Sequence, residues 1–241
     1  MSDTDSAVAD QIPLPLSFDK RFSMDNYFAP NGDYVTHELK ALFDETGEAL
    51  IGLWGGVDAG KTHLLNACAH YARHCKLPFH LFDAAQLLEA DAQSFSDFPP
   101  GSVLGVDNLD LLSGNRAWEE QFYQLINRVK QGELRFVFSL SRNPRDIGFR
   151  LPDLKSRLMW GLLIALQSPD DDQLADLLKR RAQLLGLEIN ADVLNYLLNH
   201  FSRKLSDQMQ LLYRLDHAAL SRQRKITIPF IRETLQETDR R

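Results

Sequence analysis

An apolar strand that runs directly into a glycine-rich loop constrains this chain most. Residues 50–54 are apolar, and the eight that follow match the pattern G-x-x-x-x-G-K-[ST], with its fixed positions at Gly55, Gly60, Lys61 and Thr62. Such glycines let the backbone curl until successive N–H groups face one phosphate, while the lysine reaches the outer phosphates and the threonine hydroxyl binds Mg²⁺. We therefore predict a nucleotide-binding P-loop, and the alternative is a glycine-rich turn that matches by chance.

The flanking residues extend this prediction. Residues 63–72 read as a helix, whose N-terminus would add donors and the positive end of its dipole. Upstream, Tyr27 and Phe28 are candidates for stacking on the base or for backbone contacts to it, although core packing explains them equally well. The loop residues expected to contact the nucleotide are Gly55, Gly56, Val57, Asp58, Ala59, Gly60, Lys61, Thr62 and His63.

A second apolar run, residues 102–106, ends in a carboxylate. Asp107 is placed as a strand-end residue that would hold Mg²⁺ opposite Thr62, and an ordinary turn aspartate is the alternative. Many P-loop ATPases carry another acid at the next position, where it orients or deprotonates the attacking water. This chain has Asn108 there, which cannot accept a proton, so we expect weak intrinsic hydrolysis unless Asp110 substitutes.

The remaining periodicity predicts an α/β core followed by helices alone. Strand patterns recur at 78–82, 135–141 and 162–166, and helical patterns at 33–45, 84–90 and 118–131. After residue 168 only helical patterns follow, at 168–185, 192–201, 206–222 and 229–237. We predict a disordered arm at 1–20, a core at 21–167 with a five-stranded parallel sheet flanked by helices, and a small all-helical lid at 168–241.

Three more side chains are candidates for the site. Ser141, at a strand end, is placed to sense the γ-phosphate or the attacking water, though such serines often only cap turns. Arg157 lies in the segment 151–161 and, if exposed at the domain edge, could enter a neighbour's nucleotide site. The alternative is an ordinary surface salt bridge. Arg203 precedes a lid helix and could reach back to the phosphates, or it could form a solvated basic pair with Lys204.

Composition narrows the class of partner. The net charge of −6 argues against sequence-independent coating of DNA, which favours protein partners. No apolar run is long enough to span a bilayer and the acidic start is unlike a signal peptide, so we expect a cytoplasmic protein. Two cysteines and an isolated histidine pair, His70 and His74, predict neither a disulfide framework nor a metal site.

The segment 11–16, QIPLPL, has two prolines that favour an extended backbone. An extended apolar segment loses little entropy when it docks into a groove, so this arm could bind a partner or pack on its own domain. The side chains that would dock are Gln11, Ile12, Leu14, Pro15 and Leu16.

Taken together, these motifs resemble the AAA+ superfamily, and most closely the nucleotide-binding module of the bacterial replication initiator DnaA. The segment 154–162, LKSRLMWGL, is similar to box VII of the initiator, and the resemblance implies that Arg157 is an arginine finger. Arg203 falls at the family's sensor 2 position, and Ser141 stands where the initiator has its sensor 1 acid. That departure, with Asn108, implies weak or absent independent ATPase activity.

The segment 11–16 resembles the Q-L-x-L-P-L peptide by which replication proteins dock on the β sliding clamp, with Ile12 in place of leucine. A clamp peptide joined to a DnaA-like module is the architecture of the regulatory inactivators of DnaA. The initiator continues into a helix-turn-helix domain, whereas this chain ends at Arg241, so we expect no duplex-reading domain.

The resemblance implies that the chain stimulates hydrolysis of DnaA-bound ATP through Arg157, which prevents re-initiation of replication. It implies ADP or ATP with Mg²⁺ as ligands, and as partners DnaA and the β clamp (the β subunit of DNA polymerase III). DNA would be contacted mainly through the clamp, no membrane is involved, and self-association is left open. The rival interpretations are a self-assembling AAA+ ATPase that loads a helicase or remodels DNA, and a P-loop kinase of small metabolites.

Overall fold

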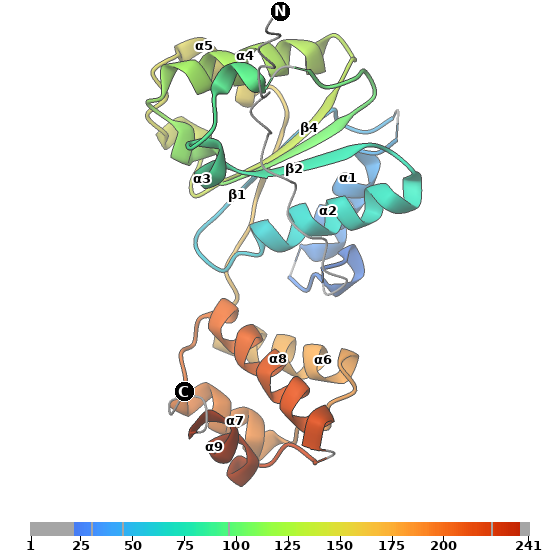
Figure 1. The fold of residues 1–241 in the computed structure, drawn as a ribbon, viewed down its shortest axis with the longest axis vertical. Coiled ribbons are helices and arrows are strands. Elements are labelled where there is room, and N and C mark those ends of the chain that lie inside the picture. The colour runs from blue at the N-terminus through green and yellow to red at the C-terminus, as the bar shows by residue number, and fades with distance from the viewer. Residues whose placement is uncertain (1–21, 30, 45, 96, 223, 237–241) are drawn as a thin grey trace, which may run out of the picture. The chain divides into compact units, whose positions relative to one another are not determined.

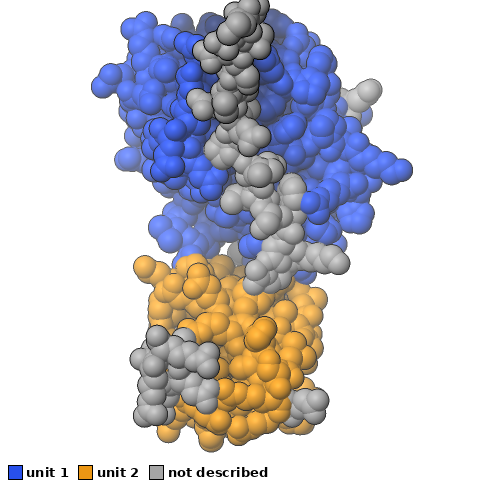
Figure 2. Space-filling model, in the orientation of Figure 1, with its two compact units in different colours: residues 1–167 blue, residues 168–241 orange. Residues whose placement is uncertain are grey.

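The chain divides between Gln167 and Ser168 into an α/β unit and a helical unit (Figures 1 and 2). The computed structural model describes residues 22–29, 31–44, 46–95, 97–222 and 224–236. The predicted clamp-binding segment 11–16 lies outside the described residues.

The α/β unit is built on a parallel sheet with the strand order β2-β3-β4-β1-β5. Its strands are β1 (Leu50–Trp54), β2 (Phe79–Asp83), β3 (Val103–Asp107), β4 (Arg135–Leu140) and β5 (Leu162–Ala165). The strand β1 lies between two neighbours, with Ile51 opposite Val137 of β4 and Leu162 of β5. Near-continuous apolar runs form such strands because both faces of a parallel sheet are covered. The predicted five-stranded parallel sheet is confirmed.

Helices cover both faces of this sheet (Figure 1). On one face lie α1 (Gly32–Ala41) and α2 (Lys61–Cys75), and on the other α3 (Ala84–Leu87), α4 (Arg116–Lys130) and α5 (Pro152–Leu158). Side chains alternate between the faces along a strand, so Ile51 packs toward α2 whereas Leu50 packs toward α4. The first helix ends at Ala41 rather than at residue 45, because Phe43 and Asp44 donate to carbonyls only three residues back, which tightens the chain into turns.

Because the strands are parallel, their carboxyl ends meet at one edge of the sheet. That edge carries the loop after β1, Asp107 at the end of β3 and the residues after β4. Short 3₁₀ turns also occur, η1 (Met24–Asn26), η2 (Ala92–Ser94), η3 (Leu109–Leu112) and η4 (Pro144–Asp146). Ligands of open α/β sheets bind at such an edge.

The helical unit consists of α6 (Asp171–Leu184), α7 (Ala191–His200), α8 (Leu205–Arg222) and α9 (Ile228–Gln236). Asp170 begins α6 with a capping box, in which its carboxylate accepts from the Gln173 N–H and the Gln173 side chain accepts from the Asp170 N–H. Apolar residues of α7, α8 and α9 form a separate core around Leu215 and Phe230. None of the helices in the described part of the chain is long and apolar enough to cross a membrane.

Candidate functional site

The loop after β1 has the backbone geometry that its glycines permit. Gly60 has a φ of +84°, and a Cβ placed on it would lie 2.7 Å from Cε2 of Tyr27. A Cβ on Gly55 would lie 2.4 Å from the carbonyl oxygen of Leu166. Gly60 is therefore required for conformational as well as steric reasons, and Gly55 for steric reasons.

Lys61 folds back over this loop. Its Nζ donates to the carbonyl oxygens of Gly55 and Gly56, at 2.7 and 2.6 Å. Burial lowers the pKa of this ammonium, while the nearby carboxylates of Asp107, Asp110 and Asp58 oppose that effect. The cation thus lies inside the loop, where a phosphate oxygen could take over the two carbonyl contacts.

The two predicted Mg²⁺ ligands lie together. The Thr62 hydroxyl donates to Oδ2 of Asp107 at 2.5 Å, and Asp107 is only 4% exposed. Hydroxyl and carboxylate oxygens are the donors that Mg²⁺ takes in phosphate sites, so the pair fits a magnesium-bound nucleotide.

Ser139 belongs to this site, although the sequence analysis missed it. Its hydroxyl donates to Oδ1 of Asp107 and accepts the backbone N–H of Asn108, at 2.8 Å for the second contact. The serine is fully buried between Phe138 and Leu140 in an apolar strand. A single hydroxyl inside such a strand was the signal available, because a buried hydroxyl needs a polar partner.

Ser141 faces a different carboxylate. Its backbone N–H and its hydroxyl donate to the two carboxylate oxygens of Asp110, at 3.1 and 2.5 Å. Asn108 adopts the left-handed conformation, with a φ of +56°. The acid at position 110 therefore lies in contact with Ser141, and the left-handed backbone of Asn108 forms the turn between β3 and η3.

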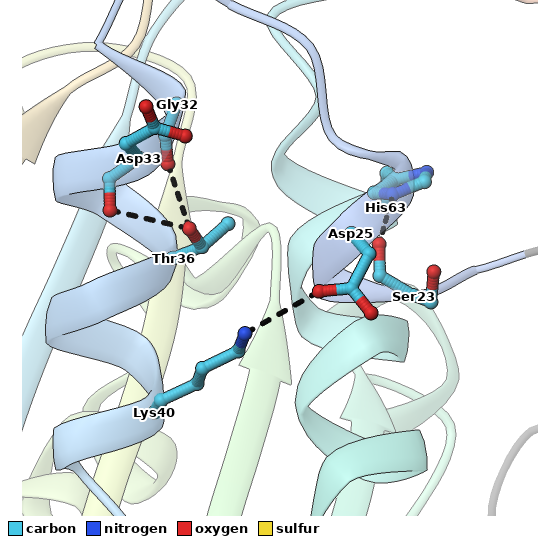
Figure 3. Close-up of polar contacts among 7 residues, drawn as sticks. All are labelled: Ser23, Asp25, Gly32, Asp33, Thr36, Lys40 and His63. Carbon is cyan, nitrogen blue, oxygen red and sulfur yellow. Dashed lines mark hydrogen bonds and ion pairs between the residues drawn. The ribbon is translucent and has the colours of Figure 1, made fainter.

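The segment before α1 contacts the loop that follows β1 and the start of α2. Tyr27 donates its hydroxyl to the carbonyl of Ala59 at 3.4 Å, and burial raises the pKa of this phenol to about 12. Figure 3 shows His63 turned toward the Ser23 carbonyl, 3.0 Å away, with Asp25 paired to Lys40 of α1 nearby. Since a carbonyl only accepts, Nε2 of His63 carries the proton.

The other predicted nucleotide contacts differ in exposure. Val57 is 77% exposed at the loop, whereas Ala59 is buried. Asp58 has a φ of +63°, and Gly56 supplies one of the carbonyls that Lys61 contacts. Phe28 is half-buried beside Tyr27. Contacts of these residues with a base or phosphate remain predictions.

Arg157 lies on α5, on the α4 side of the sheet. Its Nη2 donates to the Tyr123 hydroxyl at 2.9 Å, and its guanidinium carbon lies 4.3 Å from the Tyr123 ring centroid and 4.8 Å from that of Trp160. Within the described residues, no carboxylate forms an ion pair with this half-buried arginine. The guanidinium is thus oriented by two aromatic rings, and no acid in the described part of the chain neutralises its charge.

Arg203 lies in the helical unit, two residues before α8. Its guanidinium forms an ion pair with Asp171 at the start of α6. Both side chains are more than half exposed, so the pair contributes little to stability. The reach of Arg203 to a phosphate stays a prediction.

Comparison with known families identifies the chain. Residues 18–165 match the family model described as the bacterial DnaA ATPase domain, and residues 170–235 match the one described as the Hda lid domain. The chain belongs to the Hda group of the DnaA ATPase family. The resemblance read from the P-loop and from the Arg157 segment is confirmed.

Solved structures of this fold include members of the same family. Domain III of DnaA from Thermotoga maritima is 17% identical over 91% of this chain and 98% of its own, with a TM-score of 0.73. AMPPCP-bound DnaA from Aquifex aeolicus is 18% identical over 82% of this chain and 66% of its own, with a TM-score of 0.67. A point variant of RuvB from Thermotoga maritima is 18% identical over 89% of this chain and 71% of its own, with a TM-score of 0.64. These likenesses establish the fold.

Membership in the family assigns the two units to the two parts of an AAA+ module. The α/β unit is the AAA+ core and the helical unit is the lid, as the sequence analysis predicted for the fold class. An AAA+ core binds nucleotide, which agrees with the contacts of Lys61, Thr62 and Asp107. The roles of the individual site residues in this Hda-type protein stay predictions.

Proposed function

We propose that this chain represses replication initiation by stimulating the hydrolysis of ATP held by DnaA. It binds ADP or ATP with Mg²⁺ in its own P-loop, docks through residues 11–16 on the β sliding clamp loaded on DNA, and presents Arg157 to the partner's nucleotide. This proposal combines family membership with the contacts of the P-loop, the surroundings of Arg157 and the amino-acid sequence of residues 11–16.

The observation that carries the proposal is the state of Arg157. The Arg157 guanidinium has no acid partner among the described residues, so its positive charge is available to a phosphate. Two aromatic rings limit the orientations of the side chain. An arginine supplied in trans stabilises charge that develops on the transferred phosphoryl group. Arg157 would thereby supply a partner's site with the charge that completes it.

The chain's own nucleotide has a different role in this proposal. Asn108 cannot take a proton from water, and the carboxylate of Asp110 already accepts two hydrogen bonds from Ser141. Both facts favour a nucleotide that is bound and retained over one that is turned over. The bound nucleotide would keep the loop and Asp107 in a fixed arrangement, with Arg203 of the lid as a further candidate contact.

The proposal also names DnaA as the partner that holds the hydrolysed ATP. A related DnaA was solved with AMPPCP and single-stranded DNA, which shows that DnaA holds a triphosphate analogue. That structure is 18% identical to this chain. The resemblance of residues 11–16 to a clamp-binding peptide supplies the second partner.

The decisive experiment measures the loss of radiolabelled ATP from DnaA in the presence of this chain, clamp and DNA, with each component omitted in turn. We expect fast hydrolysis only with all components, and a deletion of residues 11–16 should abolish it while nucleotide binding by the chain persists. Hydrolysis of DnaA-bound ATP at the basal rate with every component present would refute the proposal.

The rival ATPase interpretation has its own measurement. Single-turnover hydrolysis by the purified chain alone should be slow, because no acid stands at position 108. Rapid turnover that depends on Asp110 would favour a self-assembling ATPase. Phosphoryl transfer to an added small-molecule acceptor would favour a kinase.

A further inference from the structure

One carboxylate in the α/β unit is buried without a cation. Glu119, in the first turn of α4, is 1% exposed, and no lysine or arginine side chain of the described residues pairs with it. Its Oε1 accepts the N–H groups of Gly114 at 2.7 Å and of Arg150 at 3.0 Å, and its Oε2 accepts the N–H of Leu151 at 2.7 Å. Three main-chain donors therefore hold a charge that would otherwise be costly to bury.

These donors come from two segments that are distant in sequence. Gly114 belongs to the turn between η3 and α4, and Arg150 and Leu151 precede α5. Leu151 is the N-cap of α5, and its apolar side chain cannot accept a hydrogen bond from the first turn of the helix. Pro152 is the first residue of α5. Glu119 thus joins the start of α5 to the start of α4 across more than thirty residues.

The same face of α4 holds the other end of α5. Tyr123 lies four residues after Glu119, so the two side chains project from neighbouring turns of one helix face. Tyr123 accepts from Arg157, in the last turn of α5, while Glu119 accepts from Leu151, the N-cap of α5. The short helix is therefore attached to α4 at both ends.

We infer that Glu119 is a positioning residue for the arginine finger, acting through the main chain at the start of α5. This inference rests on the proposed function of Arg157. An apolar residue would fill the same buried position, but it would not fix the direction of three N–H groups. Orientation matters here because a displacement of about 1 Å in a reacting group can cost roughly 100-fold in rate.

The test uses the full chain and DnaA loaded with ATP, with clamp and DNA present. In Glu119→Gln an amide N–H₂ replaces one acceptor oxygen and faces a backbone donor, so the start of α5 loses a bond. We expect the maximal stimulated rate to fall by roughly 10- to 100-fold. The half-saturating concentration for DnaA and the chain's own affinity for nucleotide should stay within about twofold of the wild-type values. Glu119→Asp, which keeps the charge, should give a rate between those of the wild type and Glu119→Gln.

A matched control separates positioning from general destabilisation. Arg128, near the other end of α4, donates to the Phe98 carbonyl and to Glu133, and neither partner lies on α5. Arg128→Ala removes a polar clasp from the same helix, and we expect it to lower Tm but to leave the maximal stimulated rate within about twofold. A fall in rate equal to that of Glu119→Gln would overturn the inference.

Amide hydrogen exchange gives a readout that does not depend on DnaA. In Glu119→Gln the remaining amide oxygen can still accept from Gly114 and Arg150, as Oε1 does, so the NH₂ group faces the Leu151 N–H. The amide of Leu151 should therefore exchange much faster, while the amides of β1 and β4 stay protected. Unchanged protection at Leu151, or loss of protection throughout the sheet, would contradict a local role of Glu119 in fixing the start of α5.

The two proposals fail in different ways. If Arg157→Ala leaves stimulation intact, the proposed function fails whatever Glu119→Gln does. If Arg157→Ala abolishes stimulation and Glu119→Gln does not reduce it, the finger stands and the positioning role of Glu119 is refuted.

Discussion

Two cations of the AAA+ core are suited to phosphate, and they are held in opposite ways. Lys61 donates to carbonyl oxygens five and six residues away in its own loop, and the nearby carboxylates include Asp107. Among the described residues, Arg157 contacts a hydroxyl and two aromatic rings, from residues on α4 and just after α5. The lysine is placed by a local motif, and the arginine is placed by tertiary packing.

The difference separates the two halves of the proposed activity. A cation whose described hydrogen bonds go to its own loop serves a ligand bound to that loop, because a phosphate can replace those hydrogen bonds. A cation with aromatic neighbours and no described acid partner keeps its charge available to another molecule. Changes at one site should therefore leave the other site's function intact, and the following predictions test that separation.

The largest effect is expected from Arg157→Ala. Removal of an arginine finger costs about 10³-fold or more in the stimulated rate of phosphoryl transfer. Mant-ADP titration of the variant should give the wild-type affinity, because Arg157 makes no described contact with the P-loop. A variant that stimulates DnaA normally, or that loses its own nucleotide, would break the comparison.

The loop should respond to Gly60→Ala. The new Cβ would lie 2.7 Å from the Tyr27 ring at a φ of +84°, so the loop must shift, and we expect nucleotide affinity to fall by about 10- to 100-fold, the worth of one or two charge-assisted hydrogen bonds. Gly101→Ala is the matched control, since Gly101 has a φ of +83° with nothing within 4 Å. Both substitutions carry backbone strain of about 1 kcal/mol, and only the first should weaken binding in a mant-ADP titration.

A smaller effect is expected from Tyr123→Phe. The ring beside Arg157 remains, but the hydrogen bond from Nη2 is lost. For a partly exposed bond between a charged donor and a neutral hydroxyl, this loss is worth about 0.5–1.5 kcal/mol. The stimulated hydrolysis rate should fall about two- to tenfold. Tyr34→Phe, which alters an exposed tyrosine of the same unit, should change nothing. A rate increase in Tyr123→Phe would mean that Tyr123 restrains the finger instead of orienting it.

The comparison also explains which features the sequence could reveal. The P-loop, Asp107 and the strands are encoded in short contiguous stretches, whose apolar runs and glycine spacing were sufficient to predict the sheet and its binding edge. Thr62 and Asp107 meet because parallel strands end at one edge.

The contacts that the sequence analysis missed join segments about thirty residues apart. Ser139 meets Asp107 and Glu119 meets Leu151 across 32 positions each, and Arg157 meets Tyr123 across 34. Nothing local distinguishes Glu119 from an exposed acid in the first turn of a helix, and the place of Ser139 inside an apolar strand does not identify Asp107 as its partner. Strand pairing decided the second case, since it turns Ser139 toward Asp107 and leaves Ser141 beyond the strand, beside Asp110.

The smallest effect is expected from Tyr27, which donates a hydrogen bond to the P-loop and makes no described contact with Arg157. Burial raises the pKa of this phenol from 10.0 to about 12, so the unfolded chain loses the proton at lower pH than the folded chain. Stability conferred by the neutral phenol is present below pH 10 and is lost as the pH rises from about 10 to about 12. At pH 11 the loss in the free energy of unfolding attributable to Tyr27 should be about 1 kcal/mol after allowance for partial exposure.

In urea unfolding, the stability of Tyr27→Phe should therefore decline less steeply at alkaline pH than that of the wild type, with no difference in slope between pH 7 and 9. Parallel declines in the two proteins would show that the phenol under Gly60 is solvated, and the loop would then lack the rigid support that distinguishes it from the arginine face.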